Sequence, residues 1–319
     1  MVSSGRLSPD VDGRPSASDR TGPGLDTTTL REVSPRPGRP LLLDRHALLL
    51  VTVGHGTHEV DFQTYQCRPG TLIRARPGQA VRYGGQPGLD AVLLAWDADL
   101  LTGLGPDVDE PAGRTHWQLA GEDEDAVISE VSQLVVDRQR HVDGGRTADL
   151  LRHQLAVLLL RLDLLPGGRY EPPASYAESV TFHRLRRELE RTYRRTRRAE
   201  DYAERLGCSV RTLTRACLAA TGRSAKQVID DRVALQAMRL LAATDRSVAE
   251  IGRQLGFPEP TNFGRFFQRQ VGRTPGAFRA DRGRPAAAHL PGQRPPTPAG
   301  PPAVGIGRPT LARASDQDV

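Results

Sequence analysis

The chain has 319 residues, of which 38% are hydrophobic, 26% charged and 5% aromatic, with a formal net charge of +6. This length suits two ordinary domains, and the composition is typical of a soluble globular protein. The most apolar run, 155–165, contains Arg161 and Asp163 and is too short to span a bilayer. Since the N-terminus also lacks the apolar core of a signal peptide, we expect a cytoplasmic protein. Three cysteines without CxxC spacing argue against a disulfide framework or a zinc site.

Positive charge is concentrated in one third of the chain. Residues 181–280 hold 20 Arg and 1 Lys against 10 Asp and Glu, a net of +11, whereas the whole chain is +6. The remainder is therefore acidic. A basic module beside an acidic one indicates a polyanionic partner for one domain only.

The two ends of the chain have the composition of disordered segments. Residues 1–25 are rich in Ser, Gly, Asp and Pro, and residues 283–319 are dominated by Pro, Gly and Ala. Neither shows an apolar periodicity. We therefore expect both to be disordered and the tail to be functionally neutral.

Residues 40–100 carry the signals of short strands. Four β-prone runs read ALLLVTV, THEVDF, TLIRAR and DAVLLAW, and turn dipeptides such as Pro69-Gly70 and Pro77-Gly78 separate them. Short strands with turns at such regular spacing predict a small barrel or sandwich.

Two helices are expected to follow the strands, at 125–141 and 147–165. The second has a leucine seam at spacings of 4, 3, 4 and 3 residues, formed by Leu151, Leu155, Leu158, Leu162 and Leu165. Such a seam fits a dimer interface and a helix packed on its own barrel equally well. Paired glycines and prolines then mark a linker at 167–178.

The stretch 247–279 predicts a helix, a tight turn, a second helix and a short bracing helix. Ser247 and Glu250 have the spacing of a capping box, and Gly256 suits the end of that first helix. Thr274-Pro275 is a typical start for the bracing helix. The phenylalanines of the second helix recur at helical spacing and form a buried stripe, namely Phe263, Phe266 and Phe267.

Residues 199–222 repeat this plan with a turn that is one residue shorter. Between the copies, a capping box at Ser224 and Gln227 starts a helix that reaches about Ala242. Its roughly 18 residues would span about 27 Å, against about 34 Å between successive major grooves on one face of DNA. Such a helix is a suitable spacer between two recognition helices in adjacent grooves.

The outward residues of the two second helices are the candidate DNA contacts. Arginine pairs with guanine edges and Asn or Thr with other base edges, while further arginines contact phosphates. The predicted base-reading residues are Arg211, Thr214, Arg215, Thr261, Asn262 and Arg265. The predicted phosphate contacts are Arg223, Arg253, Arg269 and Arg273.

These motifs closely resemble the DNA-binding domain of the AraC/XylS family of transcription regulators. The resemblance covers about 179–280, and its most specific part is SVAEIGRQLGFPEPTNFGRFFQRQVGRTPGAFR. The segment 54–79, GHGTHEVDFQTYQCRPGTLIRARPGQ, resembles the cupin-like effector domain of such regulators. Two departures stand out: Gly252 replaces the family's usual alanine, and Pro260 occupies a position from which many members contact DNA.

The resemblance implies a two-domain α+β protein. A cupin-like β-barrel with trailing helices, at 26–166, would bind an effector and dimerise. An all-α domain with two helix-turn-helix units, at 179–282, would bind DNA. The implied partners are double-stranded DNA, a small-molecule effector, RNA polymerase and a second copy through 125–141 and 147–165, with no cofactor.

An effector would enter the barrel, where the candidate contacts are Arg74, Arg76 and Tyr83; solvent-facing strand residues are the alternative. His55, His58 and Asp61 suggest a metal site, but residues three apart on a strand face opposite sides, so no metal is expected. No nucleophile has an evident base, so we expect no enzyme. A non-specific DNA-coating protein would need only the basic charge and would not explain the paired recognition helices.

Overall fold

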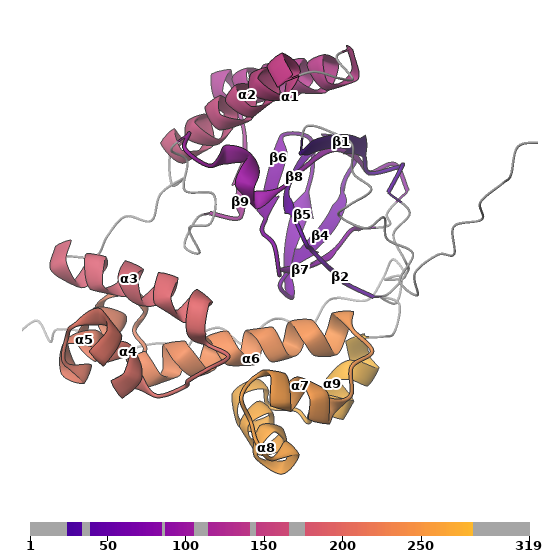
Figure 1. The fold of residues 1–319 in the computed structure, drawn as a ribbon. Helices are drawn as coiled ribbons and strands as arrows, with labels where there is room; N and C mark the ends of the chain where they lie inside the picture. The colour runs from indigo at the N-terminus through magenta and orange to yellow at the C-terminus, as the bar shows by residue number, and fades with distance from the viewer. Residues whose placement is uncertain are drawn as a thin grey trace, which may run out of the picture. The chain divides into compact units, whose positions relative to one another are not determined.

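The computed structural model describes residues 24–33, 39–84, 87–104, 114–140, 145–165 and 176–282. The predicted disordered ends lie outside these ranges except for residues 24 and 25, where strand β1 already begins at Leu25, and most of the predicted linker also lies outside them. Within the described ranges, no helix combines the length and apolarity needed to cross a bilayer. The strands are β1 (Leu25–Thr29), β2 (Leu41–Leu42), β3 (His46–Val53), β4 (Gly56–Val60), β5 (Gln63–Cys67), β6 (Thr71–Ala75), β7 (Ala80–Arg82), β8 (Asp90–Trp96) and β9 (His116–Gln118). The helices are α1 (Glu122–Arg140), α2 (Gly145–Leu164), α3 (Tyr176–Thr192), α4 (Ala199–Leu206), α5 (Val210–Thr221), α6 (Ala225–Ala243), α7 (Val248–Gln254), α8 (Pro260–Val271) and α9 (Pro275–Arg282) (Figure 1).

The described strands form two separate antiparallel sheets. One has the order β1-β8-β3-β6-β9 and the other β2-β7-β4-β5. The cupin-like barrel is therefore not closed among the described strands, and of the predicted barrel or sandwich the two sheets with a shared core have the sandwich arrangement. The edge strands are β1 and β9 in one sheet and β2 and β5 in the other, and no pairing joins the sheets in the described ranges. Of these edges, β2 and β9 offer only two and three residues for such pairing.

The strand β3 is buried on both of its faces. Leu48 and Leu50 belong to the core shared with α1 and α2, whereas Leu49 and Val51 belong to the core between the two sheets. Side chains alternate across a strand, so each face needs its own apolar layer. This explains why the run is continuously apolar and does not alternate with polar residues.

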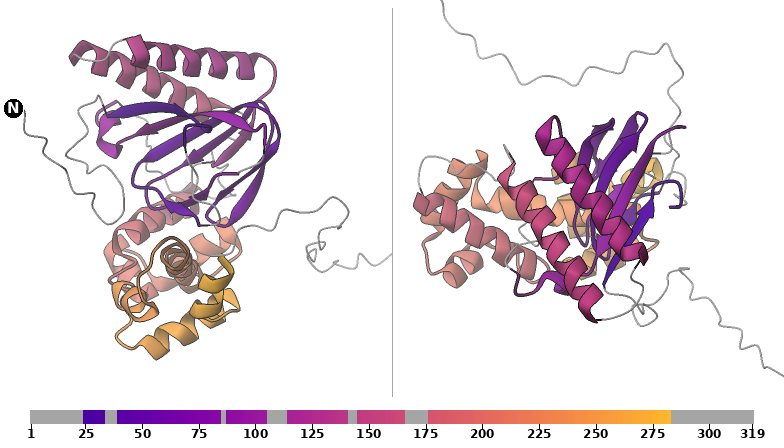
Figure 2. Two further views of the ribbon diagram at one scale, coloured as in Figure 1. Left: turned by 90° about the vertical axis from the view of Figure 1, so that its right-hand side faces the viewer. Right: turned by 90° about the horizontal axis from the view of Figure 1, so that it is seen from above.

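Helices α1 and α2 cover the outer face of the five-stranded sheet (Figure 2). The whole predicted leucine seam is buried there, with Leu151, Leu155, Leu158 and Leu162 at 0% exposure. Between the two helices, the guanidinium of Arg161 lies 2.6 Å from the carboxylate of Glu130. The seam therefore packs inside its own domain.

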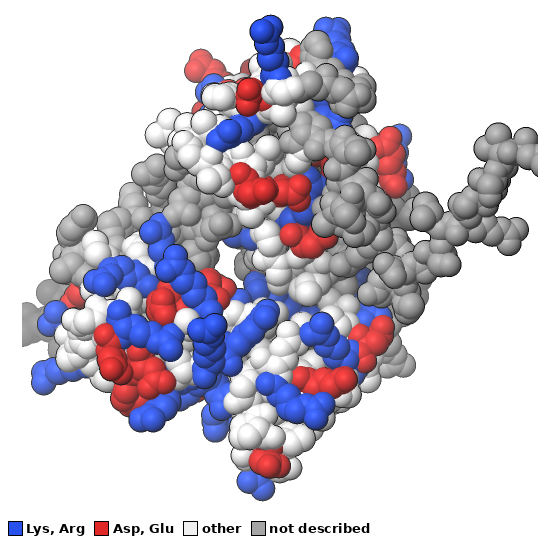
Figure 3. All heavy atoms as spheres, viewed as in Figure 1, with Lys and Arg blue, Asp and Glu red and all other residues white. Residues whose placement is uncertain are grey.

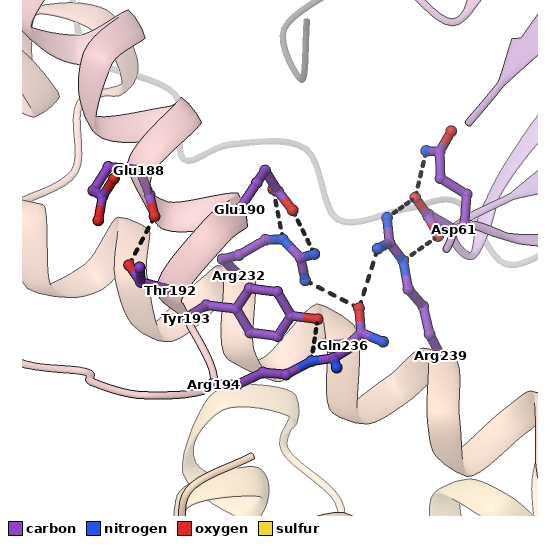
Figure 4. A network of polar contacts seen from close by, with 10 residues as sticks. Asp61, Glu188, Glu190, Thr192, Tyr193, Arg194, Arg232, Gln236 and Arg239 are labelled. Atoms are coloured by element: carbon purple, nitrogen blue, oxygen red, sulfur yellow. Dashed lines mark hydrogen bonds and ion pairs between the residues drawn. The ribbon is translucent and has the colours of Figure 1, made fainter. Parts of the chain in front are cut away.

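The predicted strand at 57–62 ends earlier, at Val60, because Asp61 and Phe62 form a two-residue hairpin turn. Both have positive φ angles, 49° and 70°, as a tight turn between twisted strands requires. The Asp61 carboxylate accepts hydrogen bonds from Gln79 at 2.6 Å and from Arg239 of α6 at 2.6 and 2.7 Å (Figure 4). Its oxygens thus contact donors of the chain itself.

The helical part is organised around α6, which is buried along most of its circumference. The predicted capping box is present: the Ser224 side chain accepts from the backbone of Gln227, and the Gln227 side chain accepts from Ser224. The second predicted box, Ser247 with Glu250, starts α7 in the same way. Local capping chemistry was therefore a reliable guide to where these helices begin.

Two left-handed glycines provide a matched test of the packing around the α7–α8 turn. Gly256 and Gly272 have φ angles of 78° and 77°. A Cβ on Gly256 would lie 2.8 Å from the carbonyl oxygen of Arg194, whereas one on Gly272 would meet no described atom within 4 Å. We expect Gly272→Ala to lower the free energy of unfolding by about 1–2 kcal/mol through backbone strain alone. Gly256→Ala should lose about 1–3 kcal/mol more, because the Arg194 carbonyl must move. Urea denaturation measures both; equal losses would mean that the Arg194 segment does not pack on this turn.

Candidate nucleic-acid interface

Helices α4 and α5 form a first helix pair, and α7 and α8 form a second. The second helix of each pair has 12 residues and ends on a glycine with left-handed angles, Gly222 in one and Gly272 in the other. In the first pair the Ser209 hydroxyl caps α5 by accepting from the backbone of Thr212 at 3.0 Å. In the second, Pro260 stands at the first position of α8. Different local signals thus produce two helices of equal length.

The inward faces of α5 and α8 match position by position but differ in size. Leu213, Ala216 and Cys217 are fully buried in α5, and Phe263, Phe266 and Phe267 take the corresponding places in α8. This difference accounts for Gly252. A Cβ on Gly252 would lie 3.1 Å from the Cβ and 3.2 Å from the Cγ of Phe263, so an alanine there, as at Ala203 of the first pair, would require Phe263 to shift slightly.

The outward faces carry the predicted base-reading residues. Thr214 is partly buried, and the remaining five are exposed: Arg211, Arg215, Thr261, Asn262 and Arg265. One of them already has a partner, since the Arg215 guanidinium lies 2.7 Å from the carboxylate of Glu178 in α3. Binding DNA through Arg215 would replace this ion pair, which at 70% side-chain exposure is weak.

The predicted phosphate contacts are all exposed. Arg223 and Arg273 directly follow the terminal glycines of α5 and α8 and so hold equivalent positions in the two pairs. Each pairs with an aspartate of the next helix, Arg223 with Asp231 at 2.9 Å and Arg273 with Asp281 at 2.8 Å. Arg269 lies over the ring of Phe266 at 5.8 Å. In the view of Figure 3, Lys and Arg side chains gather over the helices, with acidic ones between them.

Sequence reasoning gave no role to the turn between α3 and α4, although five of the eight residues 191–198 are arginine. This high density of arginine is the sequence signal that could have pointed to a role for the turn. The structure places this turn against the α7–α8 turn, where Arg197 donates to the carbonyl oxygen of Leu255 at 3.1 Å.

A cavity lies between the two sheets of the N-terminal part. Its volume is about 10 Å3, room for roughly one water molecule, and its lining includes His58, Tyr83, Ile73 and Ala75. Of the predicted effector contacts, only Tyr83 lines it. Because Ile73 and Ala75 both face the cavity, Arg74 between them points to the opposite face of the sheet.

The polar groups of this cavity are held in their neutral forms. The rings of His58 and Tyr83 lie 5.1 Å apart. Burial lowers the pKa of His58 to about 4 and raises the pKa of Tyr83 to about 12. The cavity therefore offers a neutral imidazole and a neutral phenol among aliphatic side chains.

A family model described as "Helix-turn-helix domain" matches residues 202–281, which span both helix pairs. Two curated relatives match most of the chain. The transcriptional activator RhaR of Klebsiella pneumoniae is 26% identical over 249 residues, covering 75% of this chain and 86% of the relative. RhaS of Citrobacter koseri is 25% identical over 251 residues with the same coverage. These matches support an AraC/XylS family regulator.

The chain is accordingly a DNA-binding transcription regulator, and the relatives RhaR and RhaS are named as transcriptional activators. Two solved structures also match it. ToxT from Vibrio cholerae is 12% identical, with a TM-score of 0.45, and the match covers 81% of this chain and 98% of that chain. The DNA-binding domain of AdpA, solved with a target DNA, is 33% identical, with a TM-score of 0.29, over 31% of this chain and 89% of that chain.

The buried imidazole of His58 in the regulator predicts a pH dependence of stability. An unfolded histidine takes up a proton near pH 6.5, whereas folded His58 stays neutral down to about pH 4. Since the unfolded state binds more protons in this window, stability is lost as pH falls from 6.5 to 4, by about 3 kcal/mol. His58→Gln should remove this loss, and His55→Gln, at an exposed position, should keep it. Thermal unfolding between pH 4 and 7 tests this, and parallel curves for all three proteins would contradict a buried neutral His58.

Proposed function

We propose that the chain is a sequence-specific, effector-responsive transcription regulator that reads two adjacent major grooves with α5 and α8. The observation that carries the proposal is the pair of 12-residue helices joined by α6. The 19 residues of α6 span about 28 Å, close to the roughly 34 Å between successive grooves. A rigid connection of this length supports simultaneous binding by both helices.

The two helices would read different base edges. Arg211, Thr214 and Arg215 on α5 combine two guanine-pairing side chains with a short hydroxyl, while Thr261, Asn262 and Arg265 on α8 add an amide suited to adenine. Arg223, Arg253, Arg269 and Arg273 would contact phosphates and supply salt-dependent affinity.

The cavity between the sheets is the proposed effector site. Its lining suits an uncharged and largely apolar ligand, with His58 and Tyr83 as the hydrogen-bonding groups. Because the cavity holds only about 10 Å3, the two sheets would have to separate to admit such a ligand. A charged ligand would lose its hydration without gaining an ionic partner from these residues. The effector contacts expected at Arg74 and Arg76 give way to His58 in this proposal, while Tyr83 is retained.

A second copy of the chain and RNA polymerase complete the proposed partners. Because the leucine seam of α2 is buried, a dimer would use a different stripe of that helix. Its exposed apolar residues recur at spacings of 7, 3 and 4: Leu150, Val157, Leu160 and Leu164. This is the spacing at which helices pack against each other. Contact with RNA polymerase would suit a relative of proteins named as transcriptional activators.

Selection of binding sites from a random DNA pool with the full-length protein tests the function. Two clusters of enriched bases about ten base pairs apart would support reading in adjacent grooves. Binding without enrichment, falling steeply with salt, would favour the non-specific DNA-coating protein. Repeating the selection with and without small apolar molecules tests the effector response, which would appear as a change in affinity for the enriched site.

Single arginine variants test base reading on each helix. Arg265→Ala and Arg215→Ala should each cost about 1–3 kcal/mol on the selected site and relax one base position. Fluorescence anisotropy with the selected and a shuffled duplex measures both effects. Losses of the same size on the two duplexes would assign these arginines to phosphates instead of bases.

The exposed stripe of α2 makes a prediction about oligomeric state. Sedimentation should show a wild-type dimer that Val157→Glu with Leu160→Glu converts to a folded monomer, because two buried carboxylates in each subunit would oppose association. Val53→Glu is the matched control, since Val53 is 53% exposed and lies on β3. A double variant that sediments like the wild type would exclude this face.

A further inference from the structure

The turn between α3 and α4, Tyr193–Arg198, is here called the arginine turn. It contains four arginines in six residues, in the sequence YRRTRR. The backbone amide of Arg195 donates to the carbonyl oxygen of Thr192 at 2.8 Å. Thr196 donates from its hydroxyl to Asp201 at 2.5 Å and accepts from the backbone of Arg198 at 3.2 Å. These bonds give the turn one defined conformation.

The arginine turn is anchored to α6 through Tyr193, which is 5% exposed. The guanidinium of Arg232 lies 4.1 Å over the Tyr193 ring and is held by Glu190 at 2.6 and 2.7 Å (Figure 4). Arg194 donates to the Tyr193 hydroxyl at 3.0 Å. The tyrosine thus fixes the beginning of the turn to the central helix.

The arginine turn also packs against the second helix pair. Besides donating to Leu255, the Arg197 guanidinium lies 3.6 Å over the ring of Phe257. The Arg194 carbonyl approaches Gly256 so closely that only a glycine fits there. The turn belongs to the first pair by sequence and contacts the second pair by packing, so it lies between them.

Three arginines of this turn remain exposed, namely Arg194, Arg195 and Arg198. The Arg198 side chain is 74% exposed, and its nearest carboxylates, on Glu200 and Asp201, lie 3.7 and 4.0 Å away. Exposed pairs at such distances contribute little to stability. The stability of the fold therefore does not explain why these cations lie in a turn of defined conformation.

The position of Arg198 indicates the partner. Arg198 is the N-cap of α4, as Ser247 is the N-cap of α7. In a helix-turn-helix unit the first helix crosses the DNA backbone while the second enters the groove. The start of α4 therefore faces phosphates when α5 binds. Arginine suits such a site because its planar fork pairs with phosphate oxygens.

We propose that the arginine turn is a third DNA contact, in which Arg194, Arg195 and Arg198 bind phosphates of the backbone segment between the two grooves read by α5 and α8. The inference rests on the proposed function, since it presumes that both helix pairs bind one duplex. Because the turn is attached to both pairs, this contact would also hold them at a fixed spacing on the DNA.

The test is the double variant Arg195→Gln/Arg198→Gln in the full-length chain, which leaves Arg194 on Tyr193. Its matched control is Arg140→Gln/Arg146→Gln, two exposed arginines of α1 and α2 that change the net charge equally.

Affinities for the selected duplex and a shuffled duplex are measured from 50 to 200 mM salt. The slope of log affinity against log salt should become shallower by about 1.8, since each phosphate contact contributes about 0.9. Affinity at 0.1 M salt should fall by a factor on the order of 10–100 on both duplexes, and the control should match the wild type.

Three outcomes would overturn the proposal. An unchanged slope would mean that the turn does not touch the backbone. A loss confined to the selected duplex would mean that these arginines read bases. An equal loss in the control would mean that only net charge matters. Arg195→Lys/Arg198→Lys should keep the slope, and if the double glutamine variant does not fold, Arg195→Gln alone should reduce the slope by about 0.9. A failure to select any specific site would refute the proposed function. The slope on the shuffled duplex would then still report whether these arginines bind phosphates, so the two failures are distinguishable.

Discussion

The rest of the helical part depends on the burial of one helix, α6. A helix that is apolar or satisfied on nearly every side must be covered on every side. Its small residues, among them Ala225, Ala234 and Ala237, allow other helices to approach closely. The first pair packs on one half of α6 and the second pair, with α9, on the other. The orientation of α5 relative to α8 is thus determined by packing against a common rigid element, and neither pair could turn without exposing part of this core.

The two helix pairs have similar backbones but differ in the side chains that they bury and in those that they expose. Helix α5 fills its share of the core with Leu213 and small residues, whereas α8 uses phenylalanines and has Gly252 close to Phe263. Interiors are packed to crystal-like density, so a larger side chain on one helix requires a smaller one on its neighbour. The outward residues are free of this constraint. They differ between α5 and α8, as two helices that recognise different bases would require.

The arginines of this region have different physical roles, which net charge alone does not separate. Arg197, Arg232 and Arg239 lie on aromatic rings or against carboxylates and hold parts of the fold together. Arg253 and Arg265 are exposed on the helix pairs, and Arg195 is exposed on the turn between α3 and α4. A guanidinium is weakly hydrated for a cation and stacks on aromatic faces, so the same residue type serves a buried contact and a phosphate site. Only the exposed arginines, Arg195, Arg253 and Arg265, are available to a polyanion.

Local sequence patterns predicted most of the helices, but α3 was missed and α1 begins three residues before its predicted start. Capping boxes, terminal glycines and the spacing of apolar residues are local signals, and they located α5 to α9 and the outward faces of α5 and α8. The strand part was less accessible. Of the nine described strands, β1, β2, β5, β7 and β9 were missed, because short or partly exposed strands bury few side chains and their pairing depends on distant partners. Only the tertiary structure decided that the sheets stay separate, that the leucine seam is internal and that Tyr83 faces a cavity while Arg74 does not. It also placed the turn between α3 and α4 against α7 and α8. Each of these depends on contacts between residues far apart in the chain, which no local pattern specifies.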